Sequence, residues 1–270
     1  MGNRLLLRSG QTGTFGPFHP AGFVLETAYS MLKVDLHTHT ADDPLDRISY
    51  STTDLIDRAA ALGYDALAVT LHDRQLDVRP LESYAAARGI VLISGVERTI
   101  EGRHVLLINF QRGTGAVRTF ADLARLRRGE PGLVIAPHPF FPLGSCLNDQ
   151  MDRHAELFDA VEYNAMFTAT LNFNVRAVEW ARAHGKPIVG NGDVHRLRQL
   201  GTTFSYVDAP PDPDAICEAV RQGRVTAECR PIGWIKAAGV MADMVFTDHI
   251  RGPLRRRAPI LVPELAGTDD

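Results

Sequence analysis

The stretch VDLHTH at residues 34–39 decides how the rest of the chain is interpreted. Residues 33–37 are predicted to form a short strand, because apolar and polar residues alternate there. The histidines at 37 and 39 would project from the same face of that strand, roughly 7 Å apart at their α-carbons. One metal ion could then take a nitrogen from each of them. A hydrogen-bonded pair of strand histidines fits the hexapeptide equally well, so the metal hypothesis needs further ligands.

Length and composition narrow the classes of protein. At 270 residues the chain is long enough for one α/β domain with a full core. A net charge of -3, from 29 basic and 32 acidic residues, argues against general affinity for nucleic acid through a basic surface. No run approaches the roughly 18 apolar residues of a membrane span. Three cysteines without a Cys-x-x-Cys pair predict reduced thiols in a cytoplasmic protein.

The pattern divides the chain into three parts. Residues 1–31, with frequent glycine and proline, are predicted to be a weakly structured N-terminal extension. Residues 32–230 carry the regular alternation of apolar segments and are predicted to form one domain. Residues 231–270 are predicted to be a C-terminal tail, rich in proline and arginine towards its end.

Within the predicted domain, short apolar strands alternate with amphipathic helices. Strands are expected at residues 33–37, 66–70, 90–94, 103–110, 133–136, 158–163, 187–190, 203–207 and 224–228, and helices at 53–62, 81–88, 120–128, 171–184 and 214–222. This alternation predicts parallel β-α units, which gather reactive residues at the carboxyl ends of their strands. If the strand at 103–110 forms a hairpin with its predecessor, His104 lies beside Glu97.

Histidines and carboxylates recur at these strand ends and entrances. The candidate ligands are His37, His39, His72, Glu97, His104, His138, Asp193 and His195, with one aspartate from the loop at residues 40–52. Asp43 is the first choice in that loop, ahead of Asp46 and Asp42. About nine donors are enough for two or three ions, since one ion rarely takes more than about six ligands. Imidazole and carboxylate without thiolate favour Mn, Zn or Fe.

The residues at these strand ends resemble a known family. DLHTH at 35–39, TLH at 70–72, GVE at 95–97, PHP at 137–139 and GDVH at 192–195 are similar to the ordered motifs of the PHP family, named after polymerase and histidinol phosphatase. The resemblance implies a distorted (β/α)7 barrel with a trinuclear metal centre that hydrolyses phosphoesters. Two departures are Leu71, where the family usually has an acidic residue that Asp73 could replace, and the displaced aspartate after the first motif.

The predicted mechanism follows from the charge of a phosphoester. Metal ions would lower the pKa of bound water and neutralise the phosphoryl oxygens, so that a metal-bridging hydroxide attacks phosphorus. His72, His195 and Asp193 are the candidate catalytic residues, with a site histidine or a metal-bound water protonating the leaving oxygen. Candidate phosphate clamps are Arg98, Arg196 and Arg198, for which a structural ion pair is an equally good interpretation.

The sequence therefore predicts hydrolysis of a small phosphomonoester or nucleotide, with no stable nucleic-acid partner. An exonuclease-type phosphodiesterase is an alternative that uses the same chemistry. An amidohydrolase-like enzyme that cleaves C–N bonds is another, but such barrels usually need a metal-bridging lysine at a mid-barrel strand end. Lys33 and Lys186 lie at strand beginnings and Lys236 lies late in the chain. A non-catalytic metal-binding module is the fourth hypothesis.

Overall fold

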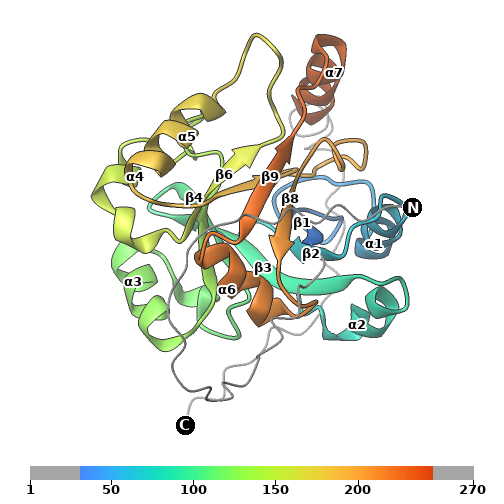
Figure 1. The fold of residues 1–270 in the computed structure, drawn as a ribbon, viewed down its shortest axis with the longest axis horizontal. Helices are drawn as coiled ribbons and strands as arrows, with labels where there is room; N and C mark the ends of the chain where they lie inside the picture. Colours follow the sequence, from blue (N-terminus) through green and yellow to red (C-terminus); the bar gives the residue numbers. More distant parts are fainter. Residues whose placement is uncertain (1–30, 246–270) are drawn as a thin grey trace, which may run out of the picture.

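Nine strands form one mixed sheet in the computed structural model, which describes residues 31–245 (Figure 1). They are β1 (Met31–Thr38), β2 (Ala66–Val69), β3 (Val91–Ile100), β4 (Arg103–Ile108), β5 (Leu133–Ala136), β6 (Ala160–Asn164), β7 (Ile188–Asn191), β8 (Thr203–Asp208) and β9 (Val225–Cys229). Their spatial order is β7-β6-β5-β4-β3-β2-β1-β8-β9. Seven of them share one direction, whereas β4 and β8 run the opposite way.

The sheet curls until its two halves meet, which makes it a nearly closed barrel. The backbone N–H of Gly190 on β7 donates to Ser205 Oγ on β8, over 2.8 Å. A Cβ on Gly190 would lie only 2.7 Å from the carbonyl oxygen of Phe204, so a residue with a side chain does not fit this approach. The segment after β7 also reaches β1, because Val194 N donates to the carbonyl of His37. The predicted α/β barrel is therefore confirmed.

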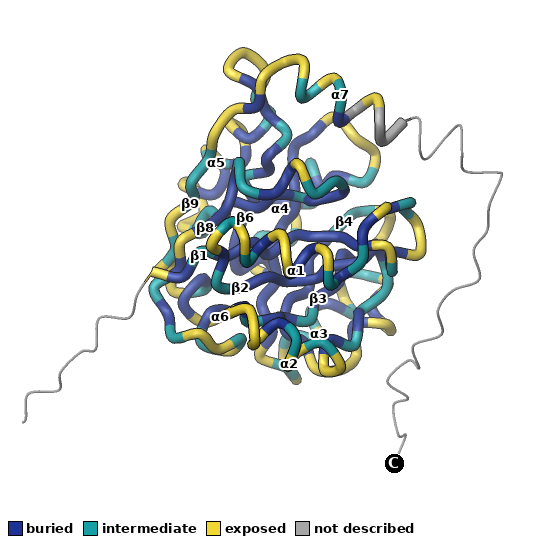
Figure 2. The backbone as a smooth tube through the Cα atoms, turned by 90° about the vertical axis from the view of Figure 1, so that its right-hand side faces the viewer, coloured by how far each residue is buried: buried dark blue, intermediate teal, exposed yellow. Residues whose placement is uncertain are grey.

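The described residues form seven α-helices: α1 (Thr52–Ala61), α2 (Arg79–Ala86), α3 (Phe120–Gly129), α4 (Gln150–Arg153), α5 (Asn174–Ala183), α6 (Pro213–Arg221) and α7 (Trp234–Val245). Figure 2 shows the strands buried and the exposed residues concentrated on helices and loops. Helix α6 packs against the buried Leu133 and Val207 near one end of the barrel. The polar side chains collect at the opposite end, where the parallel strands finish.

The observed elements differ from the predicted ones in a few places that matter for function. Strand β3 continues to Ile100, so Glu97 lies inside the strand instead of just beyond it. Helix α1 begins at Thr52, one residue before the predicted start, and is capped by Ser51 in a capping box with Asp54. Helix α5 begins at Asn174, three positions after the predicted start at residue 171.

The two ends of the chain were predicted from composition alone, and the structure shows a helix in the predicted C-terminal tail. Helix α7 occupies residues 234–245 of the segment that was predicted to be a tail. The predicted extension at residues 1–30 and the end of the tail, residues 246–270, lie outside the described residues. Within residues 31–245 no helix is long and apolar enough to cross a membrane.

Candidate metal centre

The carboxyl ends of the parallel strands bring together side chains that are up to 158 positions apart in the sequence. His37 ends β1 and His39 follows it, His72 follows β2, Glu97 lies in β3, His138 follows β5, and Asp193 and His195 follow β7. His104 opens β4, which is antiparallel, so its amino end lies at the same rim of the barrel. The hairpin predicted between β3 and β4 is confirmed, since Thr99 pairs with His104.

Glu97 is the centre of this arrangement and is only 1% exposed. Its Oε1 lies 2.7 Å from His104 Nδ1 and 3.1 Å from His138 Nε2. Its Oε2 lies 3.2 to 3.3 Å from the Nε2 atoms of His37, His39 and His72. Burial raises the pKa of this carboxyl, but the surrounding imidazoles outweigh that effect and hold its pKa well below the usual range. A single carboxylate thus faces five imidazoles.

Two buried polar atoms beside Glu97 have no hydrogen-bond partner among the described residues. They are His39 Nε2 and Asp193 Oδ1, which lie 3.8 Å apart. Asp193 Oδ1 is also 3.5 Å from His37 Nε2. A buried imidazole nitrogen and a buried carboxylate oxygen left unpaired cost free energy, which a divalent cation between them would recover. The donor set therefore fits a metal ion.

The potential ligand atoms form overlapping groups and not one isolated site. Four sets of three side chains place their ligand atoms within 4.8 Å of one another: His37, His39 and Glu97; His37, His138 and Asp193; His72, Glu97 and His104; and His39, His72 and His195. All eight strand-associated ligands predicted from the sequence occur in these sets. The overlap supports more than one ion.

Asp43, the first choice as a loop ligand, instead holds two of the histidines in place. Its Oδ2 accepts hydrogen bonds from His39 Nδ1, over 3.0 Å, and from His72 Nδ1, over 2.9 Å. The backbone N–H of His72 donates to the same oxygen, and Asp46 N donates to Oδ1. Both imidazoles are thereby fixed with Nε2 directed at the centre. Asp43 belongs to none of the potential ligand sets in the described chain, and neither does Asp46, so the loop ligand stays a prediction.

Asp46, the second choice, is better placed to contact an ion. Its Oδ2 lies 2.8 Å from His195 Nε2 and 3.7 Å from His72 Nδ1, and it lines the cavity that opens from the centre. Because Asp46 lines the cavity and Asp43 does not, we expect Asp46 to be the oxygen ligand from this loop. The sequence could not decide between them, because loop residues carry no periodic signal that fixes their direction.

We expect the two aspartates to behave differently when each is replaced by asparagine. Asp46→Asn should lower the number of tightly bound ions by about one per chain, because it removes a ligand. Asp43→Asn should keep that number but weaken metal affinity roughly 10- to 100-fold, the usual cost of losing a group that orients ligands. Metal content after dialysis and a metal titration would measure both effects. Asp42→Asn, in the same loop, is the matched control, and equal effects of all three variants would contradict the assignment.

Glu162 on β6 is a functional residue that the sequence analysis did not single out. It is fully buried, and His37 Nδ1 donates to its Oε2 over 2.7 Å. Asn164 and Asn191 side chains donate to the same carboxylate, over 2.8 and 3.2 Å. Glu162 thus directs His37 Nε2 towards Glu97, as Asp43 directs two other histidines. A charged residue within an otherwise apolar strand was the available signal, because such a residue must face a polar partner inside the barrel.

The two loops after β5 and β7 hold their ligands in unusual backbone conformations. His138 has φ of 30° and Asp193 has φ of 47°, in the left-handed region that L-residues rarely adopt. Cys146 Sγ lies 3.4 Å from His138 Nδ1, so a thiol occupies the place where a ligating histidine usually meets a carboxylate or carbonyl. Strained backbone of this kind persists where surrounding contacts impose it, which is typical of functional sites.

Arg98, the first predicted phosphate clamp, holds loops of the fold together through hydrogen bonds to backbone carbonyls. Arg98 is buried, and its guanidinium donates to the carbonyls of Val117, Asp73 and Gly115. It also forms an ion pair with Asp73 Oδ1 over 3.1 Å. Arg98 therefore cannot serve as a clamp without losing these contacts. Asp73, proposed as a substitute for the acidic residue missing at Leu71, holds Arg98 instead of a ligand.

The other two candidate clamps lie beside the centre but not in its cavity. Arg196 Nη1 donates to the carbonyl of His195, and Arg198 Nη2 donates to the carbonyl of Gly239 in α7. Neither is among the described residues that line the cavity. Within the described chain, the positive charge for a phosphate would therefore come from bound ions and not from an arginine clamp.

Burial and the neighbouring carboxylates set the protonation of the histidines before any ion binds. Burial lowers the pKa of His72, but Glu97 and Asp43 outweigh it and raise that pKa to about 9. Burial also lowers the pKa of His195, and Asp193 and Asp46 raise it to about 10. Since only the neutral imidazole binds a metal, binding must displace these protons.

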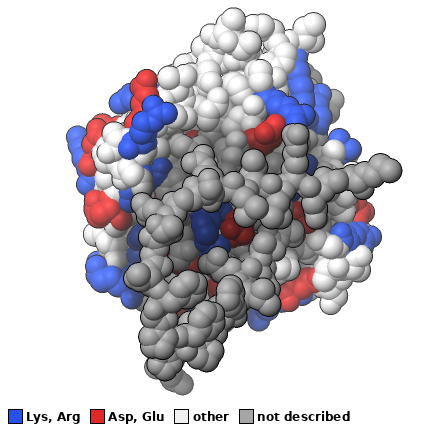
Figure 3. All heavy atoms as spheres, viewed as in Figure 1, with Lys and Arg blue, Asp and Glu red and all other residues white. Residues whose placement is uncertain are grey.

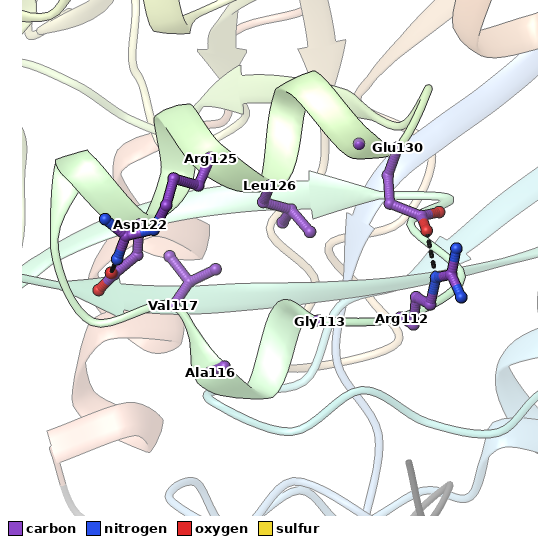
Figure 4. Close-up of a pocket in the computed structure, with 9 residues that line it drawn as sticks. Arg112, Gly113, Ala116, Val117, Asp122, Arg125, Leu126 and Glu130 are labelled. Atoms are coloured by element: carbon purple, nitrogen blue, oxygen red, sulfur yellow. Dashed lines mark hydrogen bonds and ion pairs between the residues drawn. The ribbon is translucent and has the colours of Figure 1, made fainter. Parts of the chain in front are cut away.

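The centre opens into a cavity of about 650 Å³. Its floor is formed by ligand residues such as Glu97 and His195, and its walls by loops and α7. A second pocket of about 630 Å³ lies between α3 and the turn at Thr114–Ala116 (Figure 4). There Arg112 pairs with Glu130, Arg125 pairs with Asp122, and no histidine takes part. Of these two pockets, the one at the metal centre is lined by histidines that could bind metal ions.

Comparisons with known proteins agree with this arrangement. A family model described as PHP-associated matches residues 172–225, and no curated protein matches the chain. A two-domain protein from Bacteroides vulgatus ATCC 8482, described as containing a predicted PHP-like metal-dependent phosphoesterase, is similar in structure. Its TM-score is 0.57 and its identity 18%, over 81% of this chain and 71% of that one. PsfC from Pseudomonas syringae PB-5123 has a TM-score of 0.58 and 19% identity, over 84% of this chain and 100% of that one. The chain therefore shares its fold with these two structures, and it matches the PHP-associated family model over residues 172–225, a segment that includes the GDVH motif.

Proposed function

We propose that this protein hydrolyses a small phosphoester, most readily a monoester, with two or three divalent ions of Mn, Zn or Fe. The observation that carries the proposal is the convergence of five imidazoles on Glu97, next to the unpaired His39 Nε2 and Asp193 Oδ1. Burying so many ionisable groups costs free energy, and the fold does not need them for its stability. It suits a reaction in which negative charge gathers on a phosphoryl group.

Three groups of residues would hold the ions. His37, His39, Glu97 and Asp193 form the first proposed group, which contains both unpaired atoms. His104 and His138 share Glu97 Oε1 and form the second group with it. The third group consists of Asp46, His72 and His195 at the mouth of the centre. Bound divalent ions would supply positive charge for the phosphoryl oxygens and make water more acidic.

The reaction itself exchanges one bond to phosphorus for another. A water oxygen forms a bond to phosphorus, the bond from phosphorus to the ester oxygen breaks, and the leaving oxygen receives a proton. His72 and His195 both line the cavity, and either of them would deliver that proton in a state where it does not hold an ion, since a metal-bound imidazole has no proton to give. His195 Nδ1 lies 3.2 Å from the backbone carbonyl oxygen of Asp193, which would orient its ring. These three residues are the proposed catalytic group.

The cavity supports a small substrate more than a nucleic acid. None of its described lining residues is lysine or arginine, whereas surfaces that bind a nucleic-acid backbone are rich in both. The same absence of lysine among the described lining residues argues against an amidohydrolase-like centre of the lysine-bridged type. Both alternatives nevertheless use metal-activated water, so they belong in the same assay.

We expect the metal-loaded protein to release phosphate from p-nitrophenyl phosphate and to act more slowly on bis(p-nitrophenyl) phosphate. A panel of carboxamides should stay intact, because the site is arranged around phosphoryl charge. Treatment with a chelator should abolish turnover, and added Mn or Zn should restore it. Colorimetric assay of p-nitrophenol and of free amine measures all three. Cleavage of an amide without any phosphoester turnover would overturn the proposal.

A further inference from the structure

One wall of the cavity beside the metal centre is built from large apolar side chains. The loop after β5 supplies Phe141 and Leu143, and the loop after β6 supplies Leu171 and Phe173. Helix α7 adds Trp234. A backbone hydrogen bond from Ile232 N to the carbonyl of Phe167 ties the start of α7 to the β6–α5 loop, over 3.0 Å. Segments from three parts of the chain thus combine into one apolar wall, which these five side chains define.

The apolar wall begins directly beside the residues that would hold the ions. The ring of Phe141 lies 6.3 Å from that of His138, centre to centre, in an edge-on arrangement. Phe173 lies 5.4 Å beyond Phe141. The wall therefore runs from a metal-facing histidine outward, along the path that the organic part of a bound phosphoester would take.

Three members of the apolar wall are exposed to an extent that is uncommon for large apolar residues. Leu143 and Trp234 are each 57% exposed, and Leu171 is 46% exposed. Figure 3 shows a mostly uncharged surface at the top of the view, where the β6–α5 loop and α7 project in Figure 1. Exposed apolar side chains grouped at the mouth of a cavity are typical of a binding site.

The charges around the cavity are confined to its floor. Each ionisable residue that lines it in the described chain belongs to the metal centre: Asp46, His72, Glu97, His104, His138, Asp193 and His195. A sugar or a second phosphate on the substrate would need hydrogen-bond donors or cations along the wall, and burying such groups without them costs free energy. Three uncharged polar side chains also line the cavity, Ser145, Asn164 and Thr168, but Asn164 Nδ2 already donates to Glu162 and Asp193, and Thr168 Oγ1 accepts from Leu171 N. Most of the wall therefore offers apolar contact.

We infer that the substrate is the phosphoester of an apolar alcohol, whose alkyl or aryl group lies against Phe141, Leu171 and Trp234. This inference rests on the proposed function, since it assumes that the phosphoryl group lies at the metal centre. It specifies what the leaving group is, and it assigns the β6–α5 loop and α7 to substrate selection. These segments hold no ligand of the centre, so they can set specificity without taking part in the chemistry.

A series of n-alkyl phosphates from ethyl to hexyl tests the inference on the metal-loaded full-length protein. The leaving-group acidities in this series are nearly constant, so changes in kcat/KM report contact with the chain and not chemical reactivity. Each methylene group removed from water is worth roughly fourfold in affinity. We expect kcat/KM to rise at least tenfold from ethyl to hexyl phosphate. Glycerol phosphate, similar in size to the butyl ester but polar, should show no gain over ethyl phosphate.

Variants of the apolar wall separate substrate contact from general effects. Trp234→Ala and Leu171→Ala should flatten the rise with chain length, so that hexyl phosphate loses most of its advantage over ethyl phosphate. Both side chains are about half exposed, so their removal costs little packing. Ile235→Ala is the matched control, because Ile235 is 92% exposed on the same helix and does not line the cavity. It should keep the full dependence on chain length.

Binding of n-alkyl phosphonates, which resist hydrolysis, gives a readout that does not depend on turnover. Calorimetry on the metal-loaded protein should show Kd falling with chain length, and Trp234→Ala should remove that trend. If no ester is cleaved but Kd still follows chain length, the proposed function fails, and only the part of the inference that makes the apolar wall a binding surface for alkyl groups stands. If esters are cleaved at equal rates and Kd is flat, the inference is overturned and the function stands. A changed sedimentation coefficient of Trp234→Ala would then indicate that the wall joins two copies of the chain.

Discussion

Replacing Glu97 with glutamine should reduce phosphoester hydrolysis about 1,000-fold or more and should release most of the bound metal. The side chain keeps its size, but it loses the charge that faces five imidazoles. An amide also has one acceptor oxygen instead of two, so it cannot contribute an oxygen to each of two neighbouring ions. Since bound ions contribute several kcal/mol of charge stabilisation, and about 1.4 kcal/mol is tenfold in rate, a loss of this size is expected.

Kinetics and metal analysis together would check this expectation. Metal content per chain, kcat and KM should be measured on the same preparations, with circular dichroism to confirm that the barrel still folds. Glu82→Gln is a suitable control, since it makes the same chemical change on an exposed position of α2. A Glu97→Gln protein that retained its metal and a tenth of its activity would show that Glu97 is not shared between ions.

The ligands could be predicted from the sequence because each is tied to a strand. Alternation places His37 on the barrel side of β1, and parallel strands place their carboxyl ends at one rim. His104 is the informative case, since it opens an antiparallel strand and still reaches the rim. Its position followed from the turn at Glu101 and Gly102, which brings it back beside Glu97. Where backbone pattern determines direction, the sequence was sufficient.

The residues that support the ligands could not be predicted in the same way. Asp43 and Asp46 lie in an irregular loop, and only the folded loop shows that the first accepts from two histidines and the second faces the cavity. Arg98 follows a ligand directly, but alternation turns it to the other face of β3, where it meets the carbonyls of Val117 and Gly115. Proximity in sequence to a ligand was therefore a poor guide to contact with a substrate.

The apolar wall also could not be predicted from the sequence. Its members come from two loops and from α7, a helix in the segment that composition assigned to a tail. Aromatic and aliphatic residues in such segments have no periodic partner that would reveal what they face. Only their convergence on the metal centre gives them a common role.

The second large effect is expected at Gly192, where alanine should destabilise the protein by about 1–3 kcal/mol and lower activity at least 100-fold. A Cβ there would lie 2.5 Å from Val194 Cγ2 and 2.6 Å from Asp35 Oδ2. Asp35 cannot easily move, because it is fully buried and accepts hydrogen bonds from the backbone N–H groups of Gly192 and His37. The substitution therefore presses the loop after β7 away from β1.

The displacement would fall on the ligands themselves, which is why activity should suffer more than stability. Gly192 precedes Asp193, whose φ of 47° already holds its carboxylate in a strained position, and a shift of β1 would move His37. Urea denaturation with and without metal, together with kcat/KM, would measure the two effects. Gly129→Ala provides the comparison, since a Cβ there meets nothing within 4 Å and lies at the end of α3. If Gly192→Ala kept both its urea midpoint and its activity within twofold, the close contact between β1 and the β7 loop could not be what positions the centre.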